Sequence, residues 1–101
     1  MNFLIKLDLK ALNDIQNAID YYDDKQIGLG ERFEAYLNKY FKSLSKNPFY
    51  QNRYDNIHCL PLKKYPFMIH FSIEEKEKSI YVHAVLNTYL NPKENWVNKN
   101  I

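Results

Sequence analysis

The fold is decided by residues 9–48, which read LKALNDIQNAIDYYDDKQIGLGERFEAYLNKYFKSLSKNP. Apolar residues recur there at the spacing of one helix face, first over roughly 9 to 24 and again from about residue 30 to the Asn47-Pro48 step. Gly28 and Gly30 bracket Leu29 and supply the conformational freedom for a tight connection. The stretch therefore predicts two amphipathic helices that return alongside each other as a hairpin.

The periodicity on either side of this hairpin indicates strands. Residues 3–7, Phe-Leu-Ile-Lys-Leu, form a short apolar run that ends at Asp8, whose side-chain oxygen is expected to cap the first helix. After the hairpin the period falls from about 3.6 to 2, which predicts strands at 57–62, 67–73 and 79–87. The order β-α-α-β-β-β predicts an α+β domain, in which the helical hairpin packs on one face of a small antiparallel sheet and leaves the other face open.

Alternation along the strands assigns side chains to the two faces of this sheet. The residues expected to pack on the helices are Phe67, Ile69, Phe71 and Ile73 in one strand and Ile80, Val82, Ala84 and Leu86 in the next. The residues expected on the open face are His58, His70, Tyr81, His83 and Asn87, with Arg53, Lys63 and Lys64 at its edge.

Length and composition limit the remaining possibilities. A chain of 101 residues predicts a single domain over 1–101, with residues 92–101 as a short tail anchored by Trp96. The formal charge is only +2, so any affinity for nucleic acid must come from local clusters of Lys and Arg. Cys59 is the only cysteine, which excludes an internal disulfide. No apolar run approaches a signal peptide or the ~18 residues of a membrane span, so a cytoplasmic location without membrane contact is expected.

The histidines of the predicted open face are the candidate catalytic groups. Imidazole titrates near neutral pH, so His58, His70 and His83 beside Tyr81 are suited to acid–base chemistry on RNA. The alternative is that they are ordinary half-exposed strand residues. They lack an i, i+4 pair or a Cys-x-x-Cys spacing, so the sequence predicts no metal site, and it implies no cofactor.

A second candidate surface is basic and aromatic. Its residues are Arg53, Lys63, Lys64, Tyr65, Tyr81 and Asn87. Cations attract phosphate or carboxylate groups and aromatic rings stack on bases, so this surface is a candidate for binding RNA or a protein partner. The competing interpretation is a solvated strand end.

Several segments of the chain resemble a known family. They are Ala-Ile-Asp-Tyr-Tyr at 18–22, Gly-Leu-Gly-Glu-Arg-Phe at 28–33, Leu-Ser-Lys-Asn-Pro at 44–48, Arg53-Tyr54, Leu-Lys-Lys-Tyr-Pro-Phe at 62–67, Ala-Val-Leu-Asn-Thr at 84–88, Asn91-Pro92 and Trp96. In this order and spacing they are similar to the RelE/ParE toxins of bacterial toxin–antitoxin pairs, over nearly the whole chain. The resemblance implies a growth-inhibiting toxin that a cognate antitoxin neutralises by direct binding.

The activities known in that family divide into inhibition of DNA gyrase, typical of ParE-like members, and ribosome-associated cleavage of mRNA, typical of RelE-like members. In many relatives the last strand ends in a His that is followed shortly by an Arg, whereas this chain has Asn87 and Leu90. Asn87 cannot titrate and Leu90 carries no charge, so the RelE-type catalytic set is incomplete. The ParE-like branch, with gyrase as target, is therefore favoured. The alternatives are a ribosome-dependent endoribonuclease and a degenerate, non-toxic binding module.

Overall fold

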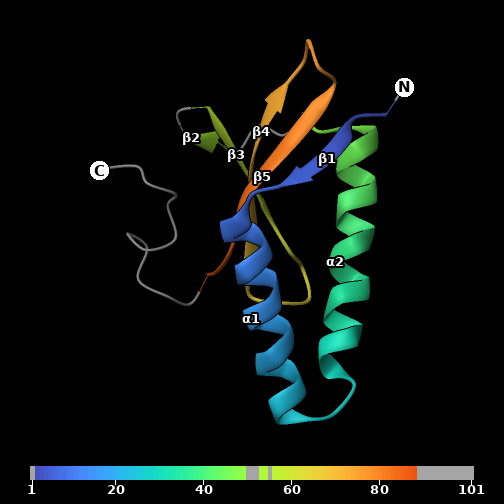
Figure 1. Cartoon of the computed structure of the whole chain (residues 1–101), viewed down its shortest axis with the longest axis vertical. Coiled ribbons are helices and arrows are strands. Elements are labelled where there is room, and N and C mark those ends of the chain that lie inside the picture. Colours follow the sequence, from blue (N-terminus) through green and yellow to red (C-terminus); the bar gives the residue numbers. More distant parts are fainter. Residues whose placement is uncertain (1, 50–52, 55, 89–101) are drawn as a thin grey trace.

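The computed structural model describes residues 2–49, 53–54 and 56–88, which form two helices and one sheet (Figure 1). In chain order the elements are β1 (Leu4–Leu7), α1 (Leu9–Lys25), α2 (Leu29–Lys46), β2 (Arg53–Tyr54), β3 (Ile57–Pro61), β4 (Phe67–Glu74) and β5 (Ser79–Asn87). The α+β class and the predicted element order are confirmed, with the short β2 added. The predicted tail at 92–101, with Trp96, and the position of Leu90 lie outside the described residues.

The two helices form the predicted hairpin, and its glycines have different roles. Gly28 precedes α2 with φ of 97°, a left-handed conformation that residues with a side chain rarely adopt. Gly30 is needed for space instead, because a Cβ at this position would lie 2.5 Å from the carbonyl oxygen of Ile19. Its amide donates to the Asp23 carboxylate at 2.8 Å. The hairpin is thus closed by one backbone conformation and one close helix–helix approach.

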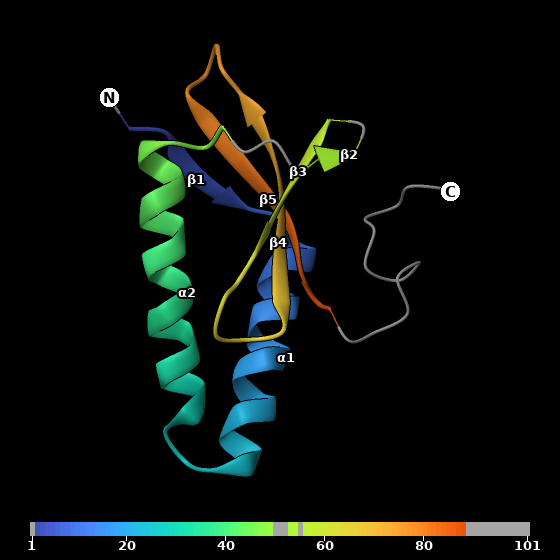
Figure 2. The same cartoon turned by 180° about the vertical axis from the view of Figure 1, so that it is seen from behind.

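The sheet has the strand order β1-β5-β4-β3-β2, and it is mixed where an antiparallel sheet was expected. Strands β3 to β5 form the predicted antiparallel meander, and the short β2 pairs antiparallel with β3. Strand β1 lies parallel to β5 at one edge. The apolar run at residues 3–7 marks a strand without specifying its partner or direction. Figure 2, turned by 180° from Figure 1, shows β3 and β4 in front of α1, so the helices cover one face of the sheet.

A β-bulge changes which side chains of β5 face the helices. The pairing of β4 with β5 shifts between His70 and Phe71, and His83 is the extra residue on β5. Beyond the bulge, Val85 and Asn87 are therefore on the helix side, while Ala84 and Leu86 are on the opposite face. The prediction was wrong for these residues because strict alternation along a strand fails at a bulge. Val85, and neither Ala84 nor Leu86, belongs to the hydrophobic core beneath the helices.

The register of β3 corrects a further prediction. His58 pairs with Phe71, which faces the helices, and the two rings stack with centroids 5.3 Å apart. His58 therefore lies on the helix side of the sheet and not on the open face as predicted. Cys59 and His70 form the next pair and face the other way. That face is not open along its whole length, since Ala84 and His70 are 0% exposed and Cys59 is 4% exposed.

Candidate functional site

A basic and aromatic groove lies where α2 meets the loop between β3 and β4. Its lining residues are Leu29, Arg32, Ala35, Tyr36, Lys39, Lys64 and Tyr65, and they enclose about 420 Å³. Helical spacing brings Arg32 and Lys39, seven residues apart, to the same face of α2. The Arg32, Lys39 and Lys64 side chains are exposed, so their charges are available to an anionic partner. We call this set the basic groove.

Two tyrosines of α2 hold the loop that completes the basic groove. The Lys63 amide donates a hydrogen bond to the Tyr40 hydroxyl at 3.2 Å, and the Lys64 amide donates one to the Tyr36 hydroxyl at 3.1 Å. The two hydroxyls are 3.2 Å apart. The hydrogen bond with Tyr40 lowers the pKa of Tyr36, and its effect is larger than the opposing effect of burial. The Lys64 and Lys63 amides and the Lys64 charge lower this pKa further. The groove is therefore a fixed, electropositive surface.

Tyr65 fixes the loop from the opposite side. The centroid of its ring lies 5.0 Å from that of Phe33, 5.1 Å from that of Tyr36 and 5.3 Å from that of Tyr22, and all three contacts are edge-to-face. Such aromatic pairs contribute roughly 0.5–1.5 kcal/mol each beyond their buried area. The side chain predicted to bind RNA or a partner thus joins the helices to the loop, and it is only half-buried at the groove.

The predicted basic cluster of Lys63, Lys64 and Arg53 is divided by the fold. Lys63 and Lys64 follow the end of β3, and their amides are hydrogen-bonded to tyrosines of α2. Arg53 belongs to β2, the edge strand, and its backbone pairs with His58 near the opposite end of β3. Sequence reasoning missed Arg32 and Lys39, although their seven-residue spacing on a polar helix face was the available signal.

The predicted histidine site is dispersed as well. His58 stacks on Phe71 on the helix side of the sheet, whereas His70 is on the far side with its Nδ1 3.6 Å from the Cys59 sulfur. Burial lowers the pKa of His70 to about 4, so this imidazole is neutral near pH 7. Burial also raises the pKa of the Cys59 thiol to about 11, which suppresses its reactivity. The expected three-histidine catalytic surface is not formed.

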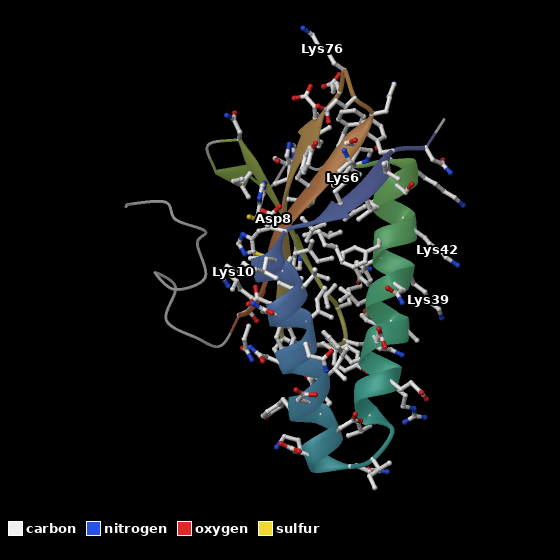
Figure 3. The ribbon with its side chains drawn as sticks, viewed as in Figure 1. Lys6, Asp8, Lys10, Lys39, Lys42 and Lys76 are labelled. Atoms are coloured by element: carbon white, nitrogen blue, oxygen red, sulfur yellow. The ribbon has the colours of Figure 1, made fainter. Side chains whose placement is uncertain are left out.

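His83 is half-buried and bonded at both ring nitrogens. Its Nδ1 lies 2.6 Å from a carboxylate oxygen of Asp8, and its Nε2 lies 2.8 Å from the Ser72 hydroxyl oxygen. Asp8 is the residue before α1, yet its side chain makes no capping hydrogen bond. The predicted cap is therefore wrong, because the carboxylate is directed to His83 instead. Figure 3 shows Asp8 where β1 meets α1, between the labelled Lys6 and Lys10.

Two other predicted residues are placed by β5. The Tyr81 hydroxyl donates to Glu77 at 2.7 Å and is 3.4 Å from the Lys6 ammonium, so Tyr81 belongs to a polar row on the far face. Asn87 lies with Asp14, Asn17 and Tyr21 of α1 around a hollow of about 300 Å³. The Val85 amide donates a hydrogen bond to the Asp14 carboxylate at 3.0 Å. This bond gives the Val85 amide a partner where β5 extends beyond the end of β1.

Within the described ranges, no three His, Cys, Asp or Glu side chains gather closely enough to hold a metal ion. Neither of the described helices combines the length and apolar character that a membrane crossing requires.

Comparison with solved structures places this architecture. A chain of the chromosomal ParDE toxin–antitoxin system of P. aeruginosa superposes with a TM-score of 0.66 at 21% identity, covering 84% of this chain and 95% of that one. A chain of the RelBE2 toxin–antitoxin complex of Mycobacterium tuberculosis superposes with a TM-score of 0.63 at 13% identity, covering 86% of this chain and 99% of that one. The isolated E. coli RelE toxin superposes with a TM-score of 0.61 at 11% identity, covering 91% of this chain and 90% of that one. Family models and curated protein sequences yielded no match.

A hairpin of two helices on one face of a mixed sheet, with the meander β3-β4-β5, is thus the architecture that this chain shares with solved chains of toxin–antitoxin systems. The chain has the RelE/ParE fold, as the resemblance of its segments implied.

Proposed function

We propose that this chain is the toxin of a type II toxin–antitoxin system, which inhibits growth in the cytoplasm until a cognate antitoxin binds it directly. The RelE/ParE fold over 84% of the chain supports this role, and the mycobacterial neighbour is a toxin–antitoxin complex. The basic groove suits an acidic antitoxin segment, because Arg32, Lys39 and Lys64 line it together.

The target we propose is DNA gyrase, and the observation that carries this choice is the dispersal of the histidines. An RNase needs a base for the ribose 2′-hydroxyl, an acid for the leaving oxygen and cations at the phosphate, all within reach of one another. Here His58 and His70 face opposite sides of the sheet, and His70 is fully buried. A toxin that acts by binding does not require such a set.

Controlled expression without an antitoxin tests the proposal. Growth arrest with induction of the DNA-damage response, accumulation of gyrase-linked DNA breaks and intact mRNA is the expected result. Rapid codon-linked cleavage of mRNA would overturn the assignment of the target. Harmless expression together with tight binding of a partner would instead identify a degenerate binding module.

The contribution of the basic groove is tested by charge reversal. Lys39→Glu combined with Lys64→Glu is expected to weaken antitoxin binding or toxicity by roughly tenfold or more, since close charge pairs at interfaces couple by about 1.5 kcal/mol or more. Lys42→Glu combined with Lys76→Glu is the matched control, because it reverses two charges on exposed lysines that do not line the groove (Figure 3). Equal effects of the control and the groove variant would contradict a specific groove.

Ribosome-dependent mRNA cleavage is the second candidate, and the hydrogen bonds at His83 favour it. An imidazole held by a carboxylate is suited to accept a proton from a ribose hydroxyl. His83→Ala would then abolish cleavage and toxicity in a folded protein, while His58→Ala would leave both intact. Retained toxicity in His83→Ala would remove this candidate.

A further inference from the structure

Asp8, His83 and Ser72 come from distant parts of the chain and meet on the sheet face away from the helices. Asp8 stands between β1 and α1, His83 is the bulged residue of β5, and Ser72 belongs to β4. The carboxylate oxygen lies 2.6 Å from Nδ1, and the serine oxygen lies 2.8 Å from Nε2. Both distances are those of good hydrogen bonds.

The carboxylate determines which group donates in each of these two hydrogen bonds. A carboxylate only accepts hydrogen bonds, so Nδ1 of His83 carries the proton that is donated to Asp8. In the neutral imidazole, Nε2 is then the acceptor, and the Ser72 hydroxyl donates to it. A serine hydroxyl in this arrangement can lose its proton to the imidazole as its oxygen attacks an electrophile.

We propose that Ser72 is an activated nucleophile, with His83 as its base and Asp8 as a positioning residue, and that its substrates are esters or other activated acyl or phosphonyl compounds. With an ester, the Oγ–C bond forms as the Ser72 proton passes to Nε2. The C–O bond to the leaving group then breaks, and the imidazolium returns the proton to the departing oxygen. Water subsequently hydrolyses the acyl-serine through the same base.

The surroundings limit which substrates can reach the site. Ser72 and His83 are half-buried, while the Asp8 side chain is 43% exposed, so the site is accessible from solvent. Ser72 pairs with Tyr81, which pairs with Lys6, and the Lys6 ammonium lies 3.4 Å from the Tyr81 hydroxyl. Glu77 lies 3.9 Å from the same ammonium, so this row carries charges of both signs and does not select substrates by their charge. Because Ser72 and His83 are half-buried, small substrates are favoured over extended chains.

The first test is covalent labelling of the purified full chain with a fluorophosphonate, in which the Oγ–P bond forms, fluoride leaves and the proton passes to His83. Peptide mapping by mass spectrometry is expected to locate the adduct at Ser72, and Ser72→Ala should lose it. Ser43, an exposed serine of α2, serves as the internal control and should label far more slowly. Labelling of Ser72 at the rate of Ser43 would overturn the proposal.

A second variant separates activation from a merely structural role of the hydrogen bonds. Asp8→Asn is nearly isosteric, but it removes the negative charge and introduces an amide that can donate to Nδ1, which favours the other imidazole tautomer, and labelling of Ser72 should slow by roughly tenfold or more. Circular dichroism confirms that each variant is folded. An unchanged labelling rate in folded Asp8→Asn would refute the role of Asp8 and the proposed activation. The assay contains no gyrase, ribosome or antitoxin, so its outcome is independent of the proposed toxin function.

Discussion

Replacement of Gly30 by alanine tests the close packing of the helical hairpin, because local and tertiary effects predict opposite signs. Glycine is up to about 1 kcal/mol less favourable than alanine in a helix interior, and at Gly30, in the first turn of α2, the same preference predicts that Gly30→Ala is stabilising. The tertiary structure predicts the reverse. The new Cβ would lie 2.5 Å from the Ile19 carbonyl oxygen and 2.8 Å from the Asp23 carboxyl group.

The magnitude follows from the distance that must be recovered. Ordinary contact begins at 3.4 Å, so the backbone of α1 must retreat by 3.4 − 2.5 = 0.9 Å at Ile19. Overpacking of this kind costs about 1–3 kcal/mol, and displacement of Asp23 weakens its hydrogen bond to the Gly30 amide. After the gain in helix propensity, we expect a net loss of about 2 kcal/mol.

Thermal and urea unfolding, followed by circular dichroism, measure this loss. A loss of about 2 kcal/mol lowers the Tm of a domain of this size by roughly 8–16 °C. Gly28→Asn is the matched control, since no atom lies within 4 Å of a Cβ there and asparagine tolerates the left-handed conformation. A Gly30→Ala protein as stable as the wild type would refute the proposed close approach.

The other predictions concern buried and hydrogen-bonded groups. Burial lowers the pKa of His70 to about 4, so between pH 6.5 and pH 4 the unfolded chain binds more protons than the folded one. The free energy of unfolding should therefore fall as the pH is lowered from 6.5 to 4. Urea titrations of His70→Gln should show a smaller fall. Cys59 should resist alkylation at pH 8 in the folded protein and react fully in urea, because burial raises its pKa to about 11; rapid labelling without denaturant would contradict its burial. Tyr36→Phe should destabilise the domain by about 1 kcal/mol and speed hydrogen exchange at the Lys64 amide, with Tyr40→Phe acting likewise on the preceding amide; unchanged exchange in both would exclude the tether.

Local patterns were enough to predict the elements of this fold except the short β2. Helical spacing located both helices, the Asn47-Pro48 step marked the end of the second, and alternation located β3, β4 and β5 to within a residue or two. Gly28 was correctly assigned to the connection, and Lys63, Lys64 and Tyr65 were correctly singled out as a basic, aromatic segment beside a strand. These features depend on neighbours in the chain, which a sequence displays directly.

The candidate sites depended on contacts that no local pattern contains. The bulge at His83 moved Asn87 to the helix side, the register of β3 placed His58 against Phe71, and the hairpin brought Arg32 and Lys39 to Lys64.

The sequence by itself determined the helices, the meander and the residues available for chemistry, because side-chain periodicity is a property of the chain. Only the tertiary structure decided which of those residues meet, since bulges, strand register and the close approach at Gly30 arise from packing between distant segments. Asp8 illustrates the difference: its position predicts a helix cap, and its partner in the folded protein, 75 residues away, is His83.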